Sequence, residues 1–228
     1  MRNKGIFICF TGIDGSGKTT LSKELVNLLK SNGIKSNYIY NRFVPFILKP
    51  FIMAARAFFL HKKDVFDDYR GYSATKIKAI EEHPFLSSLY LHLLLFDYFL
   101  QILFKIKLPL MLGRNIVCDR YIYDTIITDL AVDFNYPDEE SKMMLKKVFY
   151  LIPKPDLVFL VDVPEEIAFQ RKDDVPSVDY LFDRRKLYIK ICRDCGMIIL
   201  DGSKDLMELR NTVKREVTKY YRRREKSK

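Results

Sequence analysis

Cysteine is scarce in this sequence, with four in 228 residues. Cys9 and Cys118 lie in apolar, strand-like runs, where a buried free thiol is common, and Cys192 and Cys195 form one Cys-x-x-Cys pair. A structural zinc site would need a second such pair, and a thioredoxin-like site would need a different context. The cysteines therefore argue against a disulfide framework and against a zinc module. They indicate two thiols at a helix end and fit a reducing, cytoplasmic location.

Other signals are missing too. Residues 1–5 lead straight into an apolar run, so we expect no cleavable signal peptide. Internal repeats and low-complexity linkers are absent, and 48% of the residues are hydrophobic, enough for one sizeable core. We therefore expect a single domain over residues 1–228, with a less regular region of helices and loops at about 43–84.

Glycine is scarce as well, yet three of the nine glycines fall in FTGIDGSGKTT, residues 10–20. The spacing Gly12-x4-Gly17-Lys18-Thr19 matches the loop pattern that wraps the phosphates of a nucleotide. A tight turn is the plain alternative, because glycine accepts positive φ angles. A chance match in a chain of this length is on the order of one per cent, however. The phosphate-binding interpretation is therefore favoured.

The residues around the loop supply the context that it requires. Ile6–Phe10 is a short apolar run typical of a buried strand. After the loop, leucines recur at helical spacing as far as Asn32–Gly33, a typical helix end. Backbone N–H groups of residues 15–19 and the positive end of this helix would converge on the β-phosphate.

Each polar side chain of the loop then has an expected role. Lys18 would bridge the β- and γ-phosphates, and the hydroxyl of Thr19 would hold Mg²⁺. Ser16 and Thr20 would support the loop and the start of the helix. The expected ATP phosphate-binding residues are Gly12, Gly15, Ser16, Gly17, Lys18, Thr19 and Thr20.

Four further apolar runs, separated by helical stretches, predict more strands. They are residues 38–40, 115–119, 156–162 and 197–201. Such runs are typical of a parallel sheet covered on both faces. Asp119, Asp162 and Asp201 end three of them, at the edge where open α/β sheets bind ligands. We expect an α/β protein of the P-loop NTPase fold, with a five-stranded parallel sheet and helices on both faces.

One apolar stretch, from Pro84 to Leu112, is long enough to consider as a membrane span. Asp97 lies near its centre, and an aspartate at mid-bilayer costs about 2.5–3.5 kcal/mol. Polar residues also recur every four or five positions, at Ser88, His92, Asp97, Gln101 and Lys105. A buried helix that shows one polar stripe to a cleft explains this pattern better, and the membrane span stays as an alternative.

The formal net charge is +10, which suits polyphosphate substrates and equally suits nucleic acid. Much of the excess lies in KYYRRREKSK, residues 219–228. A charge run of this kind is typical of a solvated tail.

The motifs together resemble the thymidylate kinase family of nucleoside monophosphate kinases. FTGIDGSGKTTLSKEL looks like the phosphate loop of that family, and NIVCDRYIYDTI looks like its Asp-Arg-Tyr motif. KPDLVFLVDVPEEIAFQR is similar to its strand and helix before the lid, and IILDGSKDLMEL to its last strand and adenine loop. The resemblance covers most of the chain outside residues 43–84. It implies ATP- and Mg²⁺-dependent phosphoryl transfer to a nucleoside monophosphate.

The resemblance also implies roles for single residues. Asp119 would reach Mg²⁺ through water, and Arg120 would clamp the acceptor phosphate. Asp14 would touch the acceptor sugar and the reacting phosphates, which adds it to the ATP phosphate-binding set. Arg42 matches an arginine on the acceptor phosphate, although NRFVPF replaces the Glu-Pro-Gly-Gly-Thr that usually follows.

Towards the C-terminus the resemblance places a short lid at about residues 171–180 and an adenine loop at Gly202 and Ser203. Arg171 would reach the transferring phosphoryl group from the lid, and an ordinary helix-end cation is the alternative. Acidic Asp173 and Asp174 fill the second basic position of the lid. The expected catalytic residues are Asp14, Lys18, Arg120 and Arg171.

The largest departure lies where the family reads the base. A Phe-Ala-Ala-Asp-Arg stretch of the family is replaced by residues 94–98, LLFDY, so a tyrosine stands where the family has its base-reading arginine. On the lid side, an Asp-Arg pair becomes Asp179-Tyr180. We expect thymidylate to be at best a modest substrate. The expected acceptor-binding residues are Asp14, Arg42, Phe96, Asp97, Tyr98, Arg120, Asp179 and Tyr180.

Three functions stay open at this point. The first is phosphoryl transfer from ATP to a nucleoside monophosphate or a similar phosphorylated acceptor, with the oligomeric state open and a homodimer included. The second is a kinase of the same fold with another small acceptor. The third is a nucleotide-dependent binding or switch protein associated with a membrane or nucleic acid. GTPases and ABC-type ATPases are disfavoured, because Asn-Lys-x-Asp and LSGGQ-like motifs are absent.

Overall fold

A five-stranded parallel sheet organises the protein, seen in a computed structural model that describes residues 4–42, 84–127 and 138–226. The strand order across the sheet is β2-β3-β1-β4-β5. The strands are β1 (Phe7–Thr11), β2 (Ser36–Tyr40), β3 (Asn115–Asp119), β4 (Leu157–Asp162) and β5 (Ile198–Asp201). All five predicted strands are present, with boundaries within two residues of the apolar runs, and the predicted fold class is confirmed.

Strand β1 lies at the centre and pairs with strands that come much later in the chain. Phe7 is opposite Ile116 of β3, and Ile8 is opposite Leu157 of β4. At the start of β1, the N–H of Phe7 donates to Oδ2 of Asp156, which is 2.8 Å away and 149 residues later in the chain. Because β1 runs parallel to both β3 and β4, the carboxyl ends of the three strands meet at one edge of the sheet, where the phosphate loop follows β1.

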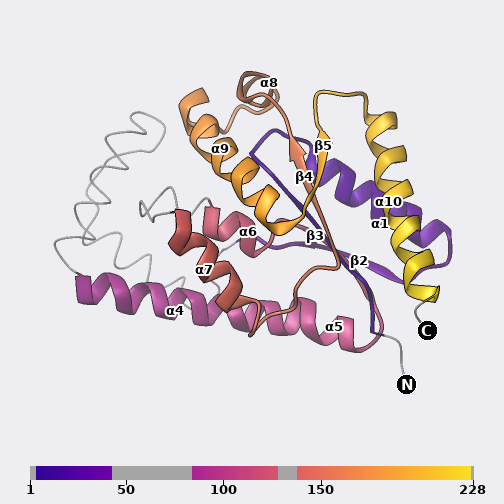
Figure 1. The fold of residues 1–228 in the computed structure, drawn as a ribbon, viewed down its shortest axis with the longest axis horizontal. Coiled ribbons are helices and arrows are strands. Elements are labelled where there is room, and N and C mark those ends of the chain that lie inside the picture. The colour runs from indigo at the N-terminus through magenta and orange to yellow at the C-terminus, as the bar shows by residue number, and fades with distance from the viewer. Residues whose placement is uncertain (1–3, 43–83, 128–137, 227–228) are drawn as a thin grey trace.

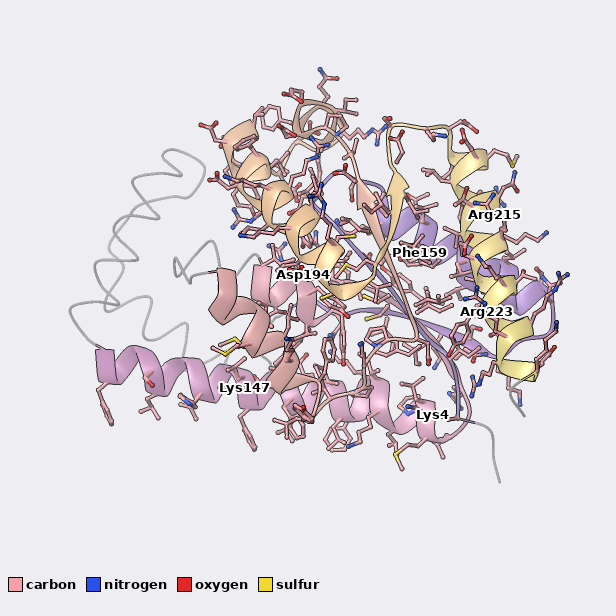
Figure 2. All side chains as sticks on the ribbon, in the orientation of Figure 1. Lys4, Lys147, Phe159, Asp194, Arg215 and Arg223 are labelled. Atoms are coloured by element: carbon pink, nitrogen blue, oxygen red, sulfur yellow. The ribbon has the colours of Figure 1, made fainter. Side chains whose placement is uncertain are left out.

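Helices cover both faces of the sheet, as predicted (Figure 1). Helices α1 (Lys18–Ser31) and α10 (Leu206–Lys226) pack on one face, in a core that includes Ile8, Phe10 and Phe159. Figure 2 shows Phe159 inside the molecule and Arg215 and Arg223 on the outside of α10.

The opposite face of the sheet carries Phe7 and Cys9 of β1, with Tyr98 of α4 and Tyr188 of α9. Its helices are α4 (Pro84–Ile102), α6 (Ile122–Asp124), α7 (Asp138–Val148) and α9 (Val178–Cys195). All four cysteines are free, and Cys192 and Cys195 lie in the last turn of α9, as predicted.

The stretch from Pro84 to Leu112 is a broken helix: α4, a π-helical turn η1 (Leu103–Lys107) and α5 (Leu108–Met111). The N–H of Leu108 bonds to the carbonyl of Leu103, five residues back. Pro109 has no N–H to offer to Lys105, which accounts for the change of hydrogen-bond pattern at this point.

The prediction of a buried helix with one exposed polar stripe is wrong for this stretch, because one side of it is exposed and apolar. We call these side chains the α4–α5 row: Phe85, Leu89, Leu93, Phe96, Phe104, Leu108, Met111 and Leu112. Of the polar residues, Asp97 is buried and accepts a hydrogen bond from Gln101, whereas His92 and Lys105 are exposed. Within the described part of the chain, no helix combines the length and the apolar character that crossing a membrane requires.

The segment predicted as the lid joins α8 (Glu165–Gln170) to α9 and is not helical from Arg171 to Ser177. Ser177 caps α9, since its hydroxyl accepts from the N–H of Tyr180 at 3.1 Å. The predicted irregular region at 43–84 lies outside the described residues up to residue 83, so its structure and the single-domain prediction stay predictions.

Candidate active site

The glycine loop between β1 and α1 has the backbone that its sequence predicts. Gly12, Gly15 and Gly17 all have positive φ angles, of 138°, 79° and 95°. A Cβ at Gly12 would lie 2.5 Å from the carbonyl oxygen of Val161, and one at Gly15 would lie 2.1 Å from that of Ala168. The loop therefore packs tightly on β4 and α8, and only glycine satisfies both the angles and the space.

The loop ends at Gly17, which precedes α1 without any side-chain cap. The first N–H groups of a helix have no partner within the helix, and the helix dipole makes this end positive. Ser16 is buried and Thr20 is exposed beside this end. The arrangement suits a polyanion.

Lys18 is buried and folds back on its own loop. Its Nζ donates to the carbonyl of Ile13 at 2.5 Å and to Ser16 Oγ at 3.3 Å. Burial, together with the positive charge of Arg120, lowers the pKa of Lys18 to about 7. The ammonium is therefore held among groups that stabilise its charge poorly, next to the positive end of α1.

Asp119 ends β3 beside the start of α1. Its Oδ2 accepts from Thr19 Oγ1 at 2.5 Å and from the Tyr38 hydroxyl at 3.0 Å. Its Oδ1 is buried and has no hydrogen-bond partner. An unsatisfied carboxylate oxygen beside a threonine hydroxyl is a donor set that fits Mg²⁺, which prefers oxygen ligands and keeps several waters and substrate phosphates. Within the described ranges no three His, Cys, Asp or Glu residues gather as a metal site.

Arg120 follows Asp119 and is the non-glycine residue with positive φ, at 70°, in the described part of the chain. Its Nη2 donates to Asp14 Oδ1 in a buried ion pair. Burial opposes ionisation of Asp14, but Arg120, Lys18 and further cations outweigh it and lower the pKa of Asp14 to about 2. A residue held at an unfavourable backbone angle is a frequent mark of a functional site.

Sequence reasoning missed Asp124, which is buried on the other side of Arg120. Its Oδ1 lies 3.5 Å from Arg120 Nη1 and accepts from the Tyr188 hydroxyl at 2.7 Å. Its Oδ2 accepts from Thr11 Oγ1 at 3.0 Å and from the N–H of Tyr121 at 2.9 Å. The spacing of four residues from Arg120 was the available signal.

Lys172, in the segment after α8, was also missed. Its Nζ lies 3.9 Å from Asp14 Oδ1 and 2.7 Å from Asp174 Oδ1. From the sequence, Asp174 occupies a position where the family has a basic residue. In the structure it pairs with Lys172, a cation that itself lies near Asp14. The basic pair Arg171-Lys172 was the available signal.

Arg171 points towards the predicted adenine loop. Its Nη1 donates to the carbonyl of Gly202 at 2.9 Å. An added Cβ on Gly202 would lie 3.2 Å from the carbonyl oxygen of Ser16, so this loop contacts the phosphate loop. The hydroxyl of Ser203 is bonded to Asp201 Oδ1 at 2.5 Å.

Known proteins resemble this chain in sequence. The sequence model of a family described as thymidylate kinase matches residues 70–213. The chain belongs to the thymidylate kinase family. It is therefore a nucleoside monophosphate kinase, and the predicted class of enzyme is confirmed.

Curated relatives extend this similarity to the phosphate loop. A thymidylate kinase of Plasmodium falciparum (isolate 3D7) is 26% identical over 227 residues, covering 96% of this chain and 92% of the relative. A probable thymidylate kinase of Sulfurisphaera tokodaii is 31% identical over 216 residues, covering 89% and 90%. Probable thymidylate kinase 1 of Saccharolobus solfataricus is 30% identical over 210 residues, covering 89% and 91%.

In this kinase, the acceptor-binding residues predicted from the family fall into two groups: those that interact with Asp14 and Arg120, and those on α4 and α9. Arg42 is exposed, yet it interacts electrostatically with Asp14, Arg120 and Tyr180. Burial and Arg120 oppose its charge, but Asp14 and the tyrosines outweigh them and raise the pKa of Arg42. The ring of Tyr180 lies under Arg184, 3.6 Å from ring centre to guanidinium carbon.

The predicted residues of α4 point in different directions: two are buried and one is exposed. Tyr98 is buried, and its hydroxyl accepts from Asn41 Nδ2 at 2.8 Å, next to Arg42. Asp97 is also buried, whereas Phe96 is 61% exposed in the α4–α5 row. Asp179 is exposed in the first turn of α9. The structure therefore places Tyr98 beside Asn41 and Arg42, and it leaves Phe96 on the exposed α4–α5 row.

Proposed function

We propose that the protein transfers the γ-phosphoryl group of ATP, with Mg²⁺, to a nucleoside monophosphate. The observation that carries this proposal is the meeting of Lys18, Asp14 and Arg120 at the glycine loop, where Asp14 forms a buried ion pair with Arg120 and the charge of Lys18 also lowers the pKa of Asp14. Reaction between two polyanions depends mainly on positioning and on charge neutralisation. Two cations beside the phosphate loop, one of them held in place by Asp14, meet that requirement.

On the donor side, the N–H groups at the start of α1 and the Nζ of Lys18 would bind the β- and γ-phosphates. Lys18 would exchange the Ile13 carbonyl and Ser16 hydroxyl for phosphate oxygens, which stabilise its charge better. Thr19 and Asp119 would hold Mg²⁺, which when bound neutralises charge on the β- and γ-phosphates. Gly202 and Ser203 would flank adenine.

On the acceptor side, Arg120 and Arg42 would bind the acceptor phosphate, and Asp14 would keep Arg120 in place. Lys172 would contribute positive charge from the lid, because its Nζ already lies 3.9 Å from Asp14. Arg171 would act near the adenine loop rather than at the transferring group in the arrangement seen here, where it donates to Gly202.

The relatives are named thymidylate kinases, so thymidylate is the first acceptor to test. We propose that it is used without a large preference over other monophosphates. Tyr98 offers one hydroxyl, already bonded to Asn41, where the family pattern has an arginine. Strong selectivity requires buried polar groups paired with the base.

The test is an ADP-release screen across the nucleoside monophosphates, with sugar phosphates and unphosphorylated nucleosides included. We expect turnover with a monophosphate acceptor, slow ADP release without one, and loss of turnover when EDTA removes Mg²⁺. Values of kcat/KM for thymidylate, uridylate, cytidylate and adenylate then measure selectivity. Hydrolysis that no acceptor accelerates would contradict the proposal, and strong thymidylate selectivity would show that another residue reads the base.

We also propose that the working form is a homodimer joined through the α4–α5 row. Phe96 and Phe104 are 61% and 64% exposed in this row, and contiguous apolar surface of this kind marks an interaction site. A two-fold axis across one helix places the same apolar side chains on both partners. Light scattering after size exclusion should give a dimer for the wild type and a monomer for Phe104→Glu. Arg222→Glu on α10 is the control, and a monomeric wild type would overturn this part.

A cytoplasmic location, expected from the cysteines, stays a prediction.

A further inference from the structure

We propose that Asp124 is a positioning residue, which holds the guanidinium of Arg120 in the orientation that binds the acceptor phosphate. The inference rests on the proposed function, because it takes Arg120 as the acceptor-phosphate ligand. Asp124 does not reach the cleft itself, since its side chain is 4% exposed beneath Arg120. It acts through Arg120.

The contacts of Asp124 divide between its two oxygens. Oδ2 is fixed to the framework, by Thr11 at the end of β1 and by the N–H of Tyr121. Oδ1 faces Arg120 Nη1 and is held from the far side by the Tyr188 hydroxyl of α9. The carboxylate therefore has a fixed plane, and one oxygen is aimed at the guanidinium.

Arg120 needs this support for a reason that is local to its backbone. Its φ of 70° is a conformation that side-chain-bearing residues seldom adopt, so its side chain leaves the strand in an unusual direction. Asp14 binds Nη2 from one side, and Asp124 lies at Nη1 on the other. Two carboxylates on different nitrogens fix the plane of the guanidinium, which a single partner would leave free to rotate.

Tyr188 extends the same support to the helix that follows the lid. Its hydroxyl is 2.7 Å from the Asp124 oxygen that faces Arg120, and its ring is buried in the core between α9 and the sheet. A shift of α9 would therefore move Asp124 Oδ1 and, with it, Arg120. Thr11 makes a bond of similar length to the other oxygen and belongs to β1, so it serves as a matched control.

The experiment compares Asp124→Asn, Tyr188→Phe and Thr11→Val in steady-state kinetics. For Asp124→Asn we expect the acceptor KM to rise about 10- to 100-fold, because a hydrogen-bonded ion pair is lost. Tyr188→Phe should raise it about two- to tenfold, since one neutral donor is lost. Thr11→Val should leave it nearly unchanged, because the Tyr121 N–H still holds Oδ2. The KM for ATP should stay within about twofold of the wild type in all three.

A double variant separates positioning from general support of the fold. In an Arg120→Ala background, Asp124→Asn should change acceptor kcat/KM by less than about twofold, because the residue that it acts through is gone. A full effect in that background would overturn the proposal. So would equal rises in the KM for ATP and for the acceptor, which are the mark of a structural role.

Crystal structures of the Asp124→Asn and Thr11→Val proteins provide a readout that does not depend on turnover. We expect the Arg120 guanidinium to be displaced or disordered in the first and unchanged in the second. If the wild type phosphorylates no monophosphate, the proposed function fails, and this comparison still decides the inference. An unmoved Arg120 in Asp124→Asn overturns it.

Discussion

At the scale of single residues, Lys18 shows how the loop is prepared for a ligand. The side chain is 4% exposed, and its hydrogen bonds go to a backbone carbonyl and a hydroxyl rather than to a carboxylate. A buried ammonium without an anionic partner in direct contact is stabilised poorly. Nucleotide phosphates would supply the missing negative charge, so the residue favours the liganded state over the empty one.

Removing this charge should stop catalysis and spare the fold. For Lys18→Ala we expect kcat to fall by about 10²- to 10³-fold or more, because charge stabilisation in the transition state is lost. The melting temperature should be unchanged or higher, since a buried cation is removed. Coupled ADP assays and thermal unfolding measure the two effects, with Lys30→Ala at the exposed end of α1 as control. Near-normal turnover in folded Lys18→Ala would be incompatible with the proposed function.

Arg120 allows a second prediction at this scale. Arg120→Ala should raise the KM for the acceptor much more than the KM for ATP, because a guanidinium recognises the phosphate that it contacts. The loss of its ion pair also leaves Asp14 and Asp124 without their shared partner. Separate saturation curves for the two substrates decide the matter. Equal losses would place Arg120 on the donor side.

At the scale of elements, Arg185 fastens α9 to the end of the sheet. Its Nε and Nη2 donate to the two oxygens of Asp162 at 2.8 and 3.1 Å, and its Nη1 donates to Glu165 at 2.7 Å. These bonds raise the pKa of Arg185 and join three elements: β4, α8 and α9. The segment predicted as the lid runs between α8 and α9, two of the elements that Arg185 holds together.

Arg185→Ala should therefore loosen the lid end of the molecule. We expect the free energy of unfolding to fall by about 2 kcal/mol, since charged hydrogen bonds are lost from a partly exposed site. Urea unfolding measures the change, and Lys186→Ala, the exposed neighbour on α9, is the control. If both variants have the same free energy of unfolding, the hydrogen bonds of Arg185 do not contribute to stability.

The elements also show how far the sequence leads. The strands were predictable because buried parallel strands are continuous apolar runs, and the glycine loop because its backbone needs particular angles and space. The roles of Asp124 and Lys172 were not, because both depend on neighbours brought in by the fold: Tyr188 for one and Asp14 for the other. The exposure of the α4–α5 row was not predicted, because an apolar helix is expected to be buried and its sequence does not show whether the same chain covers it.

At the scale of the whole molecule, Asp14 links stability to pH. Its pKa is about 2 in the folded protein, below its ordinary value of 3.8, so the folded state binds fewer protons than the unfolded state between these values. The stabilisation is present above about pH 4 and is lost as the pH falls towards 2. It amounts to about 2 kcal/mol at neutral pH.

We therefore expect wild-type stability to lose about 1 kcal/mol more than that of Asp14→Asn between about pH 5 and pH 3. Urea unfolding of both proteins at each pH gives the difference. Parallel acid dependence of the two would mean that Arg120 and the other cations do not stabilise the charge of Asp14.

The central position of β1 has a consequence for how the chain is made. Strand β1 acquires its two neighbours only after β3 and β4 have been synthesised, and the N–H of Phe7 bonds to an acceptor 149 residues later in the chain. Bringing together segments that are so far apart in the chain costs conformational entropy before any contact compensates for it, which makes folding slow. Until Leu157–Asp162 emerge, the apolar β1 has an unpaired side, so nascent chains should depend on chaperones. The phosphate loop packs against the carbonyls of Val161 and Ala168, so these contacts also have to wait until β4 and α8 have been synthesised.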